Sequence, residues 1–212
     1  MNHPDVALTD YALFIECGSF VYFLARKCHR KIWAIIFFAS AAVASLAAGT
    51  YHGFLEDPAV AQDTVFWPLA MFAIGISSLA GIKVAADISL EPKGARVISG
   101  VAWIAFFAYC LAVEFRGADF RIAIAGYAPS LFFLAWAFVH AYRKSHKGFY
   151  LTGLMGIGTV IIASVVQQAR IGIHPRYFNH NAVYHVLQGA GLNANYLAFK
   201  MNADTVEVSH RC

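Results

Sequence analysis

The chain has 212 residues, of which 59% are hydrophobic, 15% aromatic and only 13% charged. About a quarter of the residues in a soluble domain are charged, so this composition excludes a soluble globular enzyme and a disordered chain. The formal net charge of +4 comes from basic residues scattered between apolar segments. Because these residues form no basic stripe, the sequence also excludes a nucleic-acid-binding protein. The composition indicates an integral membrane protein.

Seven apolar segments approach or exceed the roughly 20 residues that a helix needs to cross the hydrocarbon core. The first covers residues 8–25 and is interrupted only by Asp10 and Glu16. We expect this segment to remain in the protein, because a cleaved signal peptide carries its positive charges before its apolar core, and here they follow it. The other six segments contain no Asp, Glu, Lys or Arg and cover residues 32–55, 64–82, 97–113, 122–142, 148–169 and 177–199.

These segments predict an all-α integral membrane protein with a single domain, a seven-transmembrane helix bundle over residues 1–200, and a polar tail over residues 201–212. The orientation follows from the basic residues, which favour the cytoplasmic side of a membrane. Twelve of the 16 Lys and Arg residues fall in the tail and in the loops after the first, third and fifth spans, and four fall on the opposite side. This split predicts an outside or lumenal N-terminus and a cytoplasmic C-terminus.

Polar residues that can carry chemistry gather at the outer end of the predicted bundle. His52 lies near the end of the second span, Glu56 in the loop that follows it, and Asp63 at the start of the third span. The first span carries Asp10 and Glu16 in its outer half. The seventh span opens with His180, Asn181 and His185. Since ionisable side chains at membrane depth are costly, each of these positions is a candidate functional residue.

Histidine and carboxylate side chains in a partly dehydrated pocket are ligands that zinc takes in proteins, and a catalytic zinc keeps one position open for water. The metal lowers the pKa of this water to about 7, which provides a hydroxide nucleophile at neutral pH. A neighbouring carboxylate such as Asp63 would accept the proton of the water. The residue types therefore predict a zinc site for hydrolysis. A haem held by His52 and His185 as axial ligands is the alternative use of the same two histidines.

Three short patterns connect these residues: Ser45-Leu-Ala-Ala-Gly-Thr-Tyr-His52, Asp63 eleven residues later, and Asn181-Ala-Val-Tyr-His185. Together they resemble the seven-pass membrane hydrolase superfamily that includes the alkaline ceramidases and the adiponectin/progestin-type receptors. The resemblance implies a zinc-dependent amidase that cleaves a long-chain lipid amide, such as a ceramide-like substrate. It implies His52 and His185 as zinc ligands, Asp63 as the superfamily aspartate and Glu16 as the first-span glutamate. A second cation, such as calcium, would lie near Glu16.

Two positions depart from the superfamily pattern of Ser-x3-His in the second span and His-x3-His in the seventh. Ala48 stands where the pattern has Ser, and Asn181 stands where it has the first His. Ser45, seven residues before His52 and on the same helical face, is the candidate replacement for the missing hydroxyl. Glu56, one turn beyond His52, and Asn181 itself are candidate replacement metal ligands.

His180 is a further candidate ligand, subject to where the last helix begins. Inside a regular helix, five residues place His180 about 140° around the axis from His185. It would reach the same ion only if the helix begins after it, and Asn179 and Asn181 are candidate caps for such a start.

The two departures leave two functions open. The first is a zinc-dependent membrane hydrolase that cleaves an amide or ester bond of a lipid. The second is a receptor-like or lipid-binding seven-helix protein that uses the same cavity without chemistry. Structural roles compete with both, since Asp63 could be a helix cap and Glu16 could pair with Gln188 or Asn193 of the last span. In either function the predicted partner is a membrane lipid.

Overall fold

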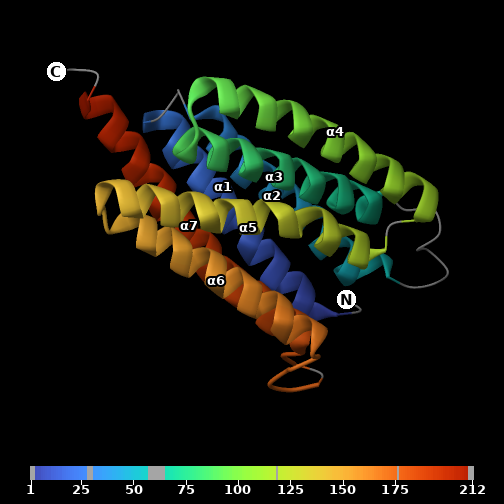
Figure 1. Ribbon diagram of the computed structural model, residues 1–212. Coiled ribbons are helices and arrows are strands. Elements are labelled where there is room, and N and C mark those ends of the chain that lie inside the picture. Colours follow the sequence, from blue (N-terminus) through green and yellow to red (C-terminus); the bar gives the residue numbers. More distant parts are fainter. Residues whose placement is uncertain (1–2, 28–30, 57–64, 118, 176, 210–212) are drawn as a thin grey trace.

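The computed structural model describes residues 3–27, 31–56, 65–117, 119–175 and 177–209. These residues form seven α-helices and one π-helical turn (Figure 1). The elements are α1 (Pro4–Lys27), α2 (Ile32–Thr50), η1 (Tyr51–Leu55), α3 (Phe66–Ser89), α4 (Pro92–Arg116), α5 (Phe120–Ser145), α6 (Phe149–Gln168) and α7 (His180–Ser209). Apart from the connecting loops, the described part of the chain is therefore helical, as the sequence predicts.

Six of these helices, α1 to α6, are long and apolar enough to cross a membrane, with η1 completing the second. They match six of the seven predicted segments. The seventh segment, residues 177–199, lies mostly in α7, which is not among the six in the described part of the chain. Its apolar stretch is interrupted by side-chain amides, including those of Asn193 and Asn195, and these lower its mean hydropathy.

Helices α1, α3, α4, α5 and α7 continue past the first charged residue that ended the predicted segment. α3 runs to Ser89, beyond Lys83 and Asp87, although the predicted segment stops at residue 82. α7 runs to Ser209, so the boundary predicted between residues 200 and 201 does not mark the end of a helix. Long charged side chains can extend into the interface while the backbone stays helical. These helices are therefore longer than the apolar segments that predicted them.

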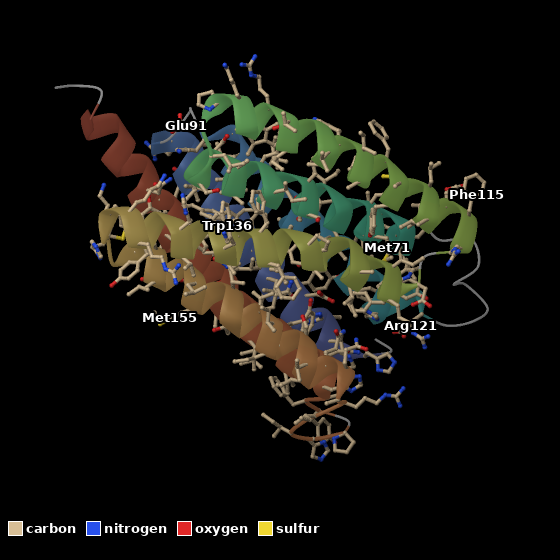
Figure 2. All side chains as sticks on the ribbon, in the orientation of Figure 1. Met71, Glu91, Phe115, Arg121, Trp136 and Met155 are labelled. Carbon is tan, nitrogen blue, oxygen red and sulfur yellow. The ribbon has the colours of Figure 1, made fainter. Side chains whose placement is uncertain are left out.

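Six helices close into a ring, and the fourth lies outside it. Around the ring α1 packs on α2, α2 on α3, α3 on α5, α5 on α6, α6 on α7, and α7 returns to α1. α4 packs mainly on α3 and is the outermost helix in Figure 1. Its outer face carries exposed apolar side chains, and Figure 2 shows Phe115 pointing away from the bundle. By contrast Met71 of α3, beneath α4, is fully buried.

Aromatic side chains from four helices fill the half of the ring farther from the N-terminus. Phe20 of α1 stacks on Tyr196 of α7, with 4.4 Å between the ring centroids. Phe38 of α2 packs edge-on against Phe20 at 5.2 Å, and Phe138 of α5 lies 6.0 Å from Phe199 of α7. Such pairs contribute about 0.5–1.5 kcal/mol each beyond the area they bury. This half of the bundle is therefore an apolar, closely packed core.

The buried face of α1 follows a repeat of four and three residues. The residues of this seam are Val6, Asp10, Leu13, Cys17, Phe20 and Leu24, and all are almost completely buried. Spacings of four and three keep side chains on one side of a helix. Asp10 occupies a seam position that would otherwise be apolar, and so a carboxylate points into the bundle between α2 and α7.

A glycine lets α2 approach this carboxylate. A Cβ atom built on Gly49 would lie 2.9 Å from the Cβ of Asp10 and 3.3 Å from the carbonyl oxygen of Ala7. Immediately beyond Gly49, α2 widens into the π-helical turn η1, which contains His52. Single π-helical turns are rare and recur at functional sites. The close contact and the widened turn thus lie at the end of α2 that faces the start of α1.

Gly49→Ala should lower the thermal unfolding midpoint of the detergent-solubilised protein, because its methyl group would collide with α1. Forcing such an atom into a packed contact costs about 1–3 kcal/mol. Gly18→Ala is the matched control, since nothing lies within 4 Å of a Cβ built there, and alanine favours the helix. Melts followed by circular dichroism measure both, and equal midpoints for the two variants would contradict the close contact.

Candidate functional site

The start of α1, the end of α2, the end of α6 and the start of α7 meet at one end of the bundle. The amide of His3 donates to the carbonyl oxygen of His52 at 3.3 Å. The amide of Asn179, just before α7, donates to Oδ2 of Asp5 at 3.0 Å. Gln167 Nε2 of α6 donates to Asn181 Oδ1 of α7 at 3.2 Å. These contacts bring together the polar segments that the sequence assigns to one membrane depth.

Asp10 and His185 form the buried centre of this end. Oδ1 of Asp10 lies 3.4 Å from Nε2 of His185, and the two residues are 2% and 8% exposed. The other ring nitrogen, Nδ1, lies 3.0 Å from the hydroxyl of Thr9. The second carboxylate oxygen of Asp10, Oδ2, is buried and makes no hydrogen bond within the described residues. One imidazole of α7 thus contacts two consecutive side chains of α1.

The two contacts of His185 are chemically linked. A neutral imidazole has one nitrogen that donates and one that accepts. When Nε2 carries the proton toward the Asp10 carboxylate, Nδ1 accepts, and Thr9 donates its single hydroxyl proton to it. Thr9 Oγ1 also lies 2.9 Å from the carbonyl oxygen of Asp5, which competes for that proton. A proton that shifts on one side of the ring therefore changes the hydrogen bond on the other.

His52 and Glu56 form a second polar pair, nearer the surface. Nδ1 of His52 lies 2.9 Å from Oε2 of Glu56, and the side chains are 17% and 35% exposed. Nε2 of His3 lies 3.7 Å from the same carboxylate oxygen. The hydrogen bond with His52 holds the pKa of Glu56 below its usual range. Rings of Tyr51 and Trp67 pack around the imidazole at 5.5 and 5.7 Å.

The His52–Glu56 pair should make stability depend on pH in the acid range. Because the pKa of Glu56 is lowered in the folded protein, its contribution is complete above the unfolded value of 4.5. It is lost as the pH falls through the folded value. Glu56→Gln should remove up to about 1 kcal/mol at pH 6, since a pair this exposed is screened by water.

Thermal melts of the wild type and Glu56→Gln between pH 7 and pH 3 measure this contribution. The difference between the two midpoints should shrink toward zero as the pH falls. Glu91→Gln, an exposed residue at the start of α4, is the control and should show no such trend. A difference that grows at low pH would contradict the pairing.

The start of α7 differs from the arrangement that would bring His180 to His185. Asn179 caps the helix, because its Oδ1 accepts from the amides of Asn181 at 2.9 Å and Ala182 at 3.2 Å. The helix therefore includes His180 as its first residue, about 140° around the axis from His185. The alternative in which α7 begins only after His180 is therefore wrong. Asn181 acts as a partner of Gln167 and not as a cap.

Glu16 lies deeper, against the backbone of α7. A Cβ atom built on Gly189 would lie 2.7 Å from Oε2 of Glu16, so the carboxylate fills the space above this glycine. The side chain of Asn193 interacts with the same carboxylate, which is one of the two pairings left open by the sequence. Glu16 is therefore separate from the Asp10–His185 contact.

Two sequence candidates are not brought to the centre by the described contacts. Ser45 lies in α2 before η1, and the same-face argument for Ser45 and His52 assumed a regular helix. His52 itself lies in the π-helical turn Tyr51–Leu55, and the described contacts do not join it to Ser45, so the role of Ser45 stays a prediction. Asp63 lies outside the described residues, which omit 57–64.

An open groove of about 420 Å³ runs along the outside of the seam between α1 and α7. Its lining residues are Thr9, Ala12, Leu13, Glu16, His185, Val186, Gly189 and Ala190. The exposed side chains of Val186 and Ala190 form its rim, so the groove opens away from the ring, where lipid would surround a membrane protein. This volume falls within the range of small-molecule sites.

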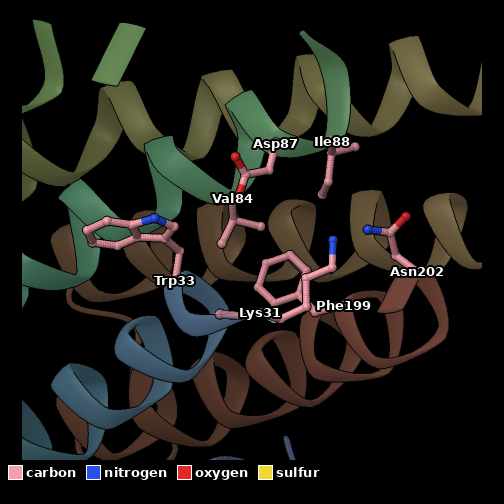
Figure 3. A pocket seen from close by; sticks show the side chains of 8 residues that line it. Lys31, Trp33, Val84, Asp87, Ile88, Phe199 and Asn202 are labelled. Atoms are coloured by element: carbon pink, nitrogen blue, oxygen red, sulfur yellow. The ribbon is translucent and has the colours of Figure 1, made fainter. Parts of the chain in front are cut away.

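A second cavity lies at the opposite end of the bundle, between α2, α3 and α7. Figure 3 shows Lys31, Asp87 and Asn202 around it, with Phe199 below. Its volume is only about 20 Å³, enough for one water molecule and too small for an organic ligand. The groove between α1 and α7 is accordingly the better candidate site.

Within the described residues, no three side chains of His, Cys, Asp or Glu lie close enough together to hold a metal ion. Two such donors, Asp10 and His185, converge. His52 lies at the same end but directs Nδ1 to Glu56. A zinc site would need at least one further ligand beyond the converging pair.

The sequence analysis placed Asp10 at the outer end of the first span but gave it no part in the zinc site, and Thr9 was not a candidate; both contact His185. The seam of α1 carries the signal that identifies Asp10: it falls at the buried spacing with Leu13 and Cys17, whereas Glu16 does not. Thr9 gives no such signal, because its role depends on the position of α7.

In a comparison with known families, residues 6–204 match a family model described as a family of unknown function (DUF6962). No curated protein and no solved structure matched the chain.

Proposed function

We propose that this chain, which belongs to the DUF6962 family, is a multi-pass membrane protein that binds a lipid in the groove between α1 and α7. The observation that carries the proposal is the lining of the groove. Apolar side chains such as Leu13 and Val186 alternate with Thr9, Glu16 and His185, along a mouth that opens away from the ring. Such a lining suits a molecule with an apolar chain and polar groups.

We also propose that α7 crosses the membrane as a seventh span, with the N-terminus outside or lumenal and the C-terminus in the cytoplasm. α7 packs between α1 and α6 along the ring, and both neighbours are apolar enough to span. A spanning α7 would bury its amide side chains against these neighbours, as with Asn195, which is 1% exposed. The asymmetry of Lys and Arg supports the orientation.

Ala190→Leu should reduce the amount of lipid that co-purifies with the protein, because a larger side chain at the rim would fill the groove. Ala125→Leu is the matched control, since Ala125 is exposed on α5 and lies away from the groove. Native mass spectrometry of the detergent-solubilised proteins measures bound lipid directly. We expect a severalfold loss for Ala190→Leu alone. Equal occupancy in both variants would contradict lipid binding in this groove.

A zinc-dependent lipid amidase or esterase is the second candidate function. It is favoured by the unpartnered Oδ2 of Asp10, a buried carboxylate oxygen of the kind that a cation or a substrate hydrogen would satisfy. The resemblance to the seven-pass hydrolases points the same way. Against it, no three such donors converge within the described residues, so the fit to zinc is incomplete. We therefore derive no catalytic step through a metal.

Elemental mass spectrometry of the purified protein, after expression with added zinc, tests this second candidate. Near-stoichiometric zinc that disappears in both His52→Ala and His185→Ala would support the hydrolase, and assays with lipid amides and esters would follow. His140→Ala, a histidine at the opposite end of the bundle, is the control and should keep the metal. Absence of zinc from the wild type would overturn the metal-dependent mechanism and leave lipid binding as the proposed function.

A further inference from the structure

A carboxylate lines the groove deep within the membrane-spanning length of α1. Glu16 is twelve residues from Pro4, the first residue of α1, or about 18 Å at the rise of an α-helix. The hydrocarbon core is about 30 Å thick, so Glu16 lies near the middle of a spanning α1. A carboxylate at this depth is costly unless it is neutralised or paired.

The protein surrounds this carboxylate with neutral groups. Its Oε2 lies over Gly189, and its side-chain partner is the amide of Asn193. None of the eight residues that line the groove is Lys or Arg, and the other polar ones are Thr9 and His185. The groove thus presents a carboxylate to the lipid side without a cationic side chain among its described lining residues.

We propose that the groove binds a lipophilic primary amine, with its ammonium group on Glu16 and its apolar chain against Ala12, Leu13 and Val186. The proposal rests on the lipid-binding function proposed above and names the chemical class of the ligand. An ammonium group donates three hydrogen bonds and carries the charge that the carboxylate lacks nearby. A charge-assisted hydrogen bond is strong where water is excluded.

The polar residues at the other end of the groove indicate where a second polar group of this ligand would lie. Thr9 and Glu16 are seven residues apart on α1, which is about 10 Å along the helix. A hydroxyl or carbonyl group at that distance from the ammonium would reach Thr9 and His185. The groove therefore suits an amine with a second polar group about 10 Å from the nitrogen.

Equilibrium binding of radiolabelled dodecylamine and dodecanol to the full-length protein in lipid nanodiscs tests the proposal, with uptake by empty nanodiscs subtracted. The wild type should bind the amine more tightly than the alcohol at pH 7.5. Glu16→Gln should weaken amine binding by at least about tenfold, as expected for a hydrogen bond to a charged group. It should leave alcohol binding unchanged.

Two further variants serve as controls. Glu114→Gln removes an exposed carboxylate from α4, outside the groove, and should bind both probes like the wild type. Glu16→Asp keeps the charge and should retain most of the affinity for the amine. This second variant keeps the test informative if Glu16→Gln does not fold, which circular dichroism would reveal.

The outcomes separate this inference from the proposed function. Equal amine affinity in the wild type and Glu16→Gln, with both probes lost in Ala190→Leu, would overturn the amine assignment and leave lipid binding in the groove. Failure of the wild type to bind either probe, or full binding by Ala190→Leu, would overturn the groove as a lipid site. Selective loss of the amine in Glu16→Gln supports both.

Discussion

A carboxylate within an apolar helix seam is costly unless another group pairs with it, and Asp10 meets His185 of α7. Both side chains are almost completely buried, and the contact spans 3.4 Å. Removing one member would leave the other buried and unpaired, which is far more destabilising than removing both. The imidazole also reaches Thr9, the residue before Asp10. These two contacts fix the register of α7 along α1 at this end of the bundle.

The position of the groove follows from this alignment of α7 along α1. Glu16 lies about two turns after Thr9 on α1, and Gly189 lies one turn after His185 on α7. The contact between Thr9 and His185 therefore brings Glu16 over Gly189. The same end of α1 is held from the other side by Gly49 of α2. In the opposite half, Phe20, Phe38 and Tyr196 pack against one another, and the cavity near Lys31 has a volume of only about 20 Å³. The bundle is thus closed by apolar packing at one end and aligned by polar contacts at the other.

The helical class and six of the spans were predictable, because long apolar segments have few alternatives to a spanning helix. The grouping of His52, Glu56 and His185 at one end follows from counting alternating spans. The hydrogen-bond and ion-pair partners of these residues could not be predicted from the sequence, because a polar contact depends on the rotation of each helix about its axis. His52 lies in a π-helical turn and contacts Glu56, and the cap at Asn179 makes His180 the first residue of α7. The burial of Asp10 could have been predicted from the spacing of the α1 seam, whereas the contact made by Thr9 depends on the register of α7.

A double-mutant cycle of Asp10 and His185 tests the central claim most directly. Asp10→Val and His185→Leu remove the polar groups with smaller changes in volume, so each single variant would leave one buried group unpaired. The account predicts that both singles lower the unfolding midpoint, and that the double variant recovers stability, with a coupling energy of about 1–3 kcal/mol. Losses that simply add in the double variant would show that Asp10 and His185 do not act as a pair, and the register of α7 would need another cause.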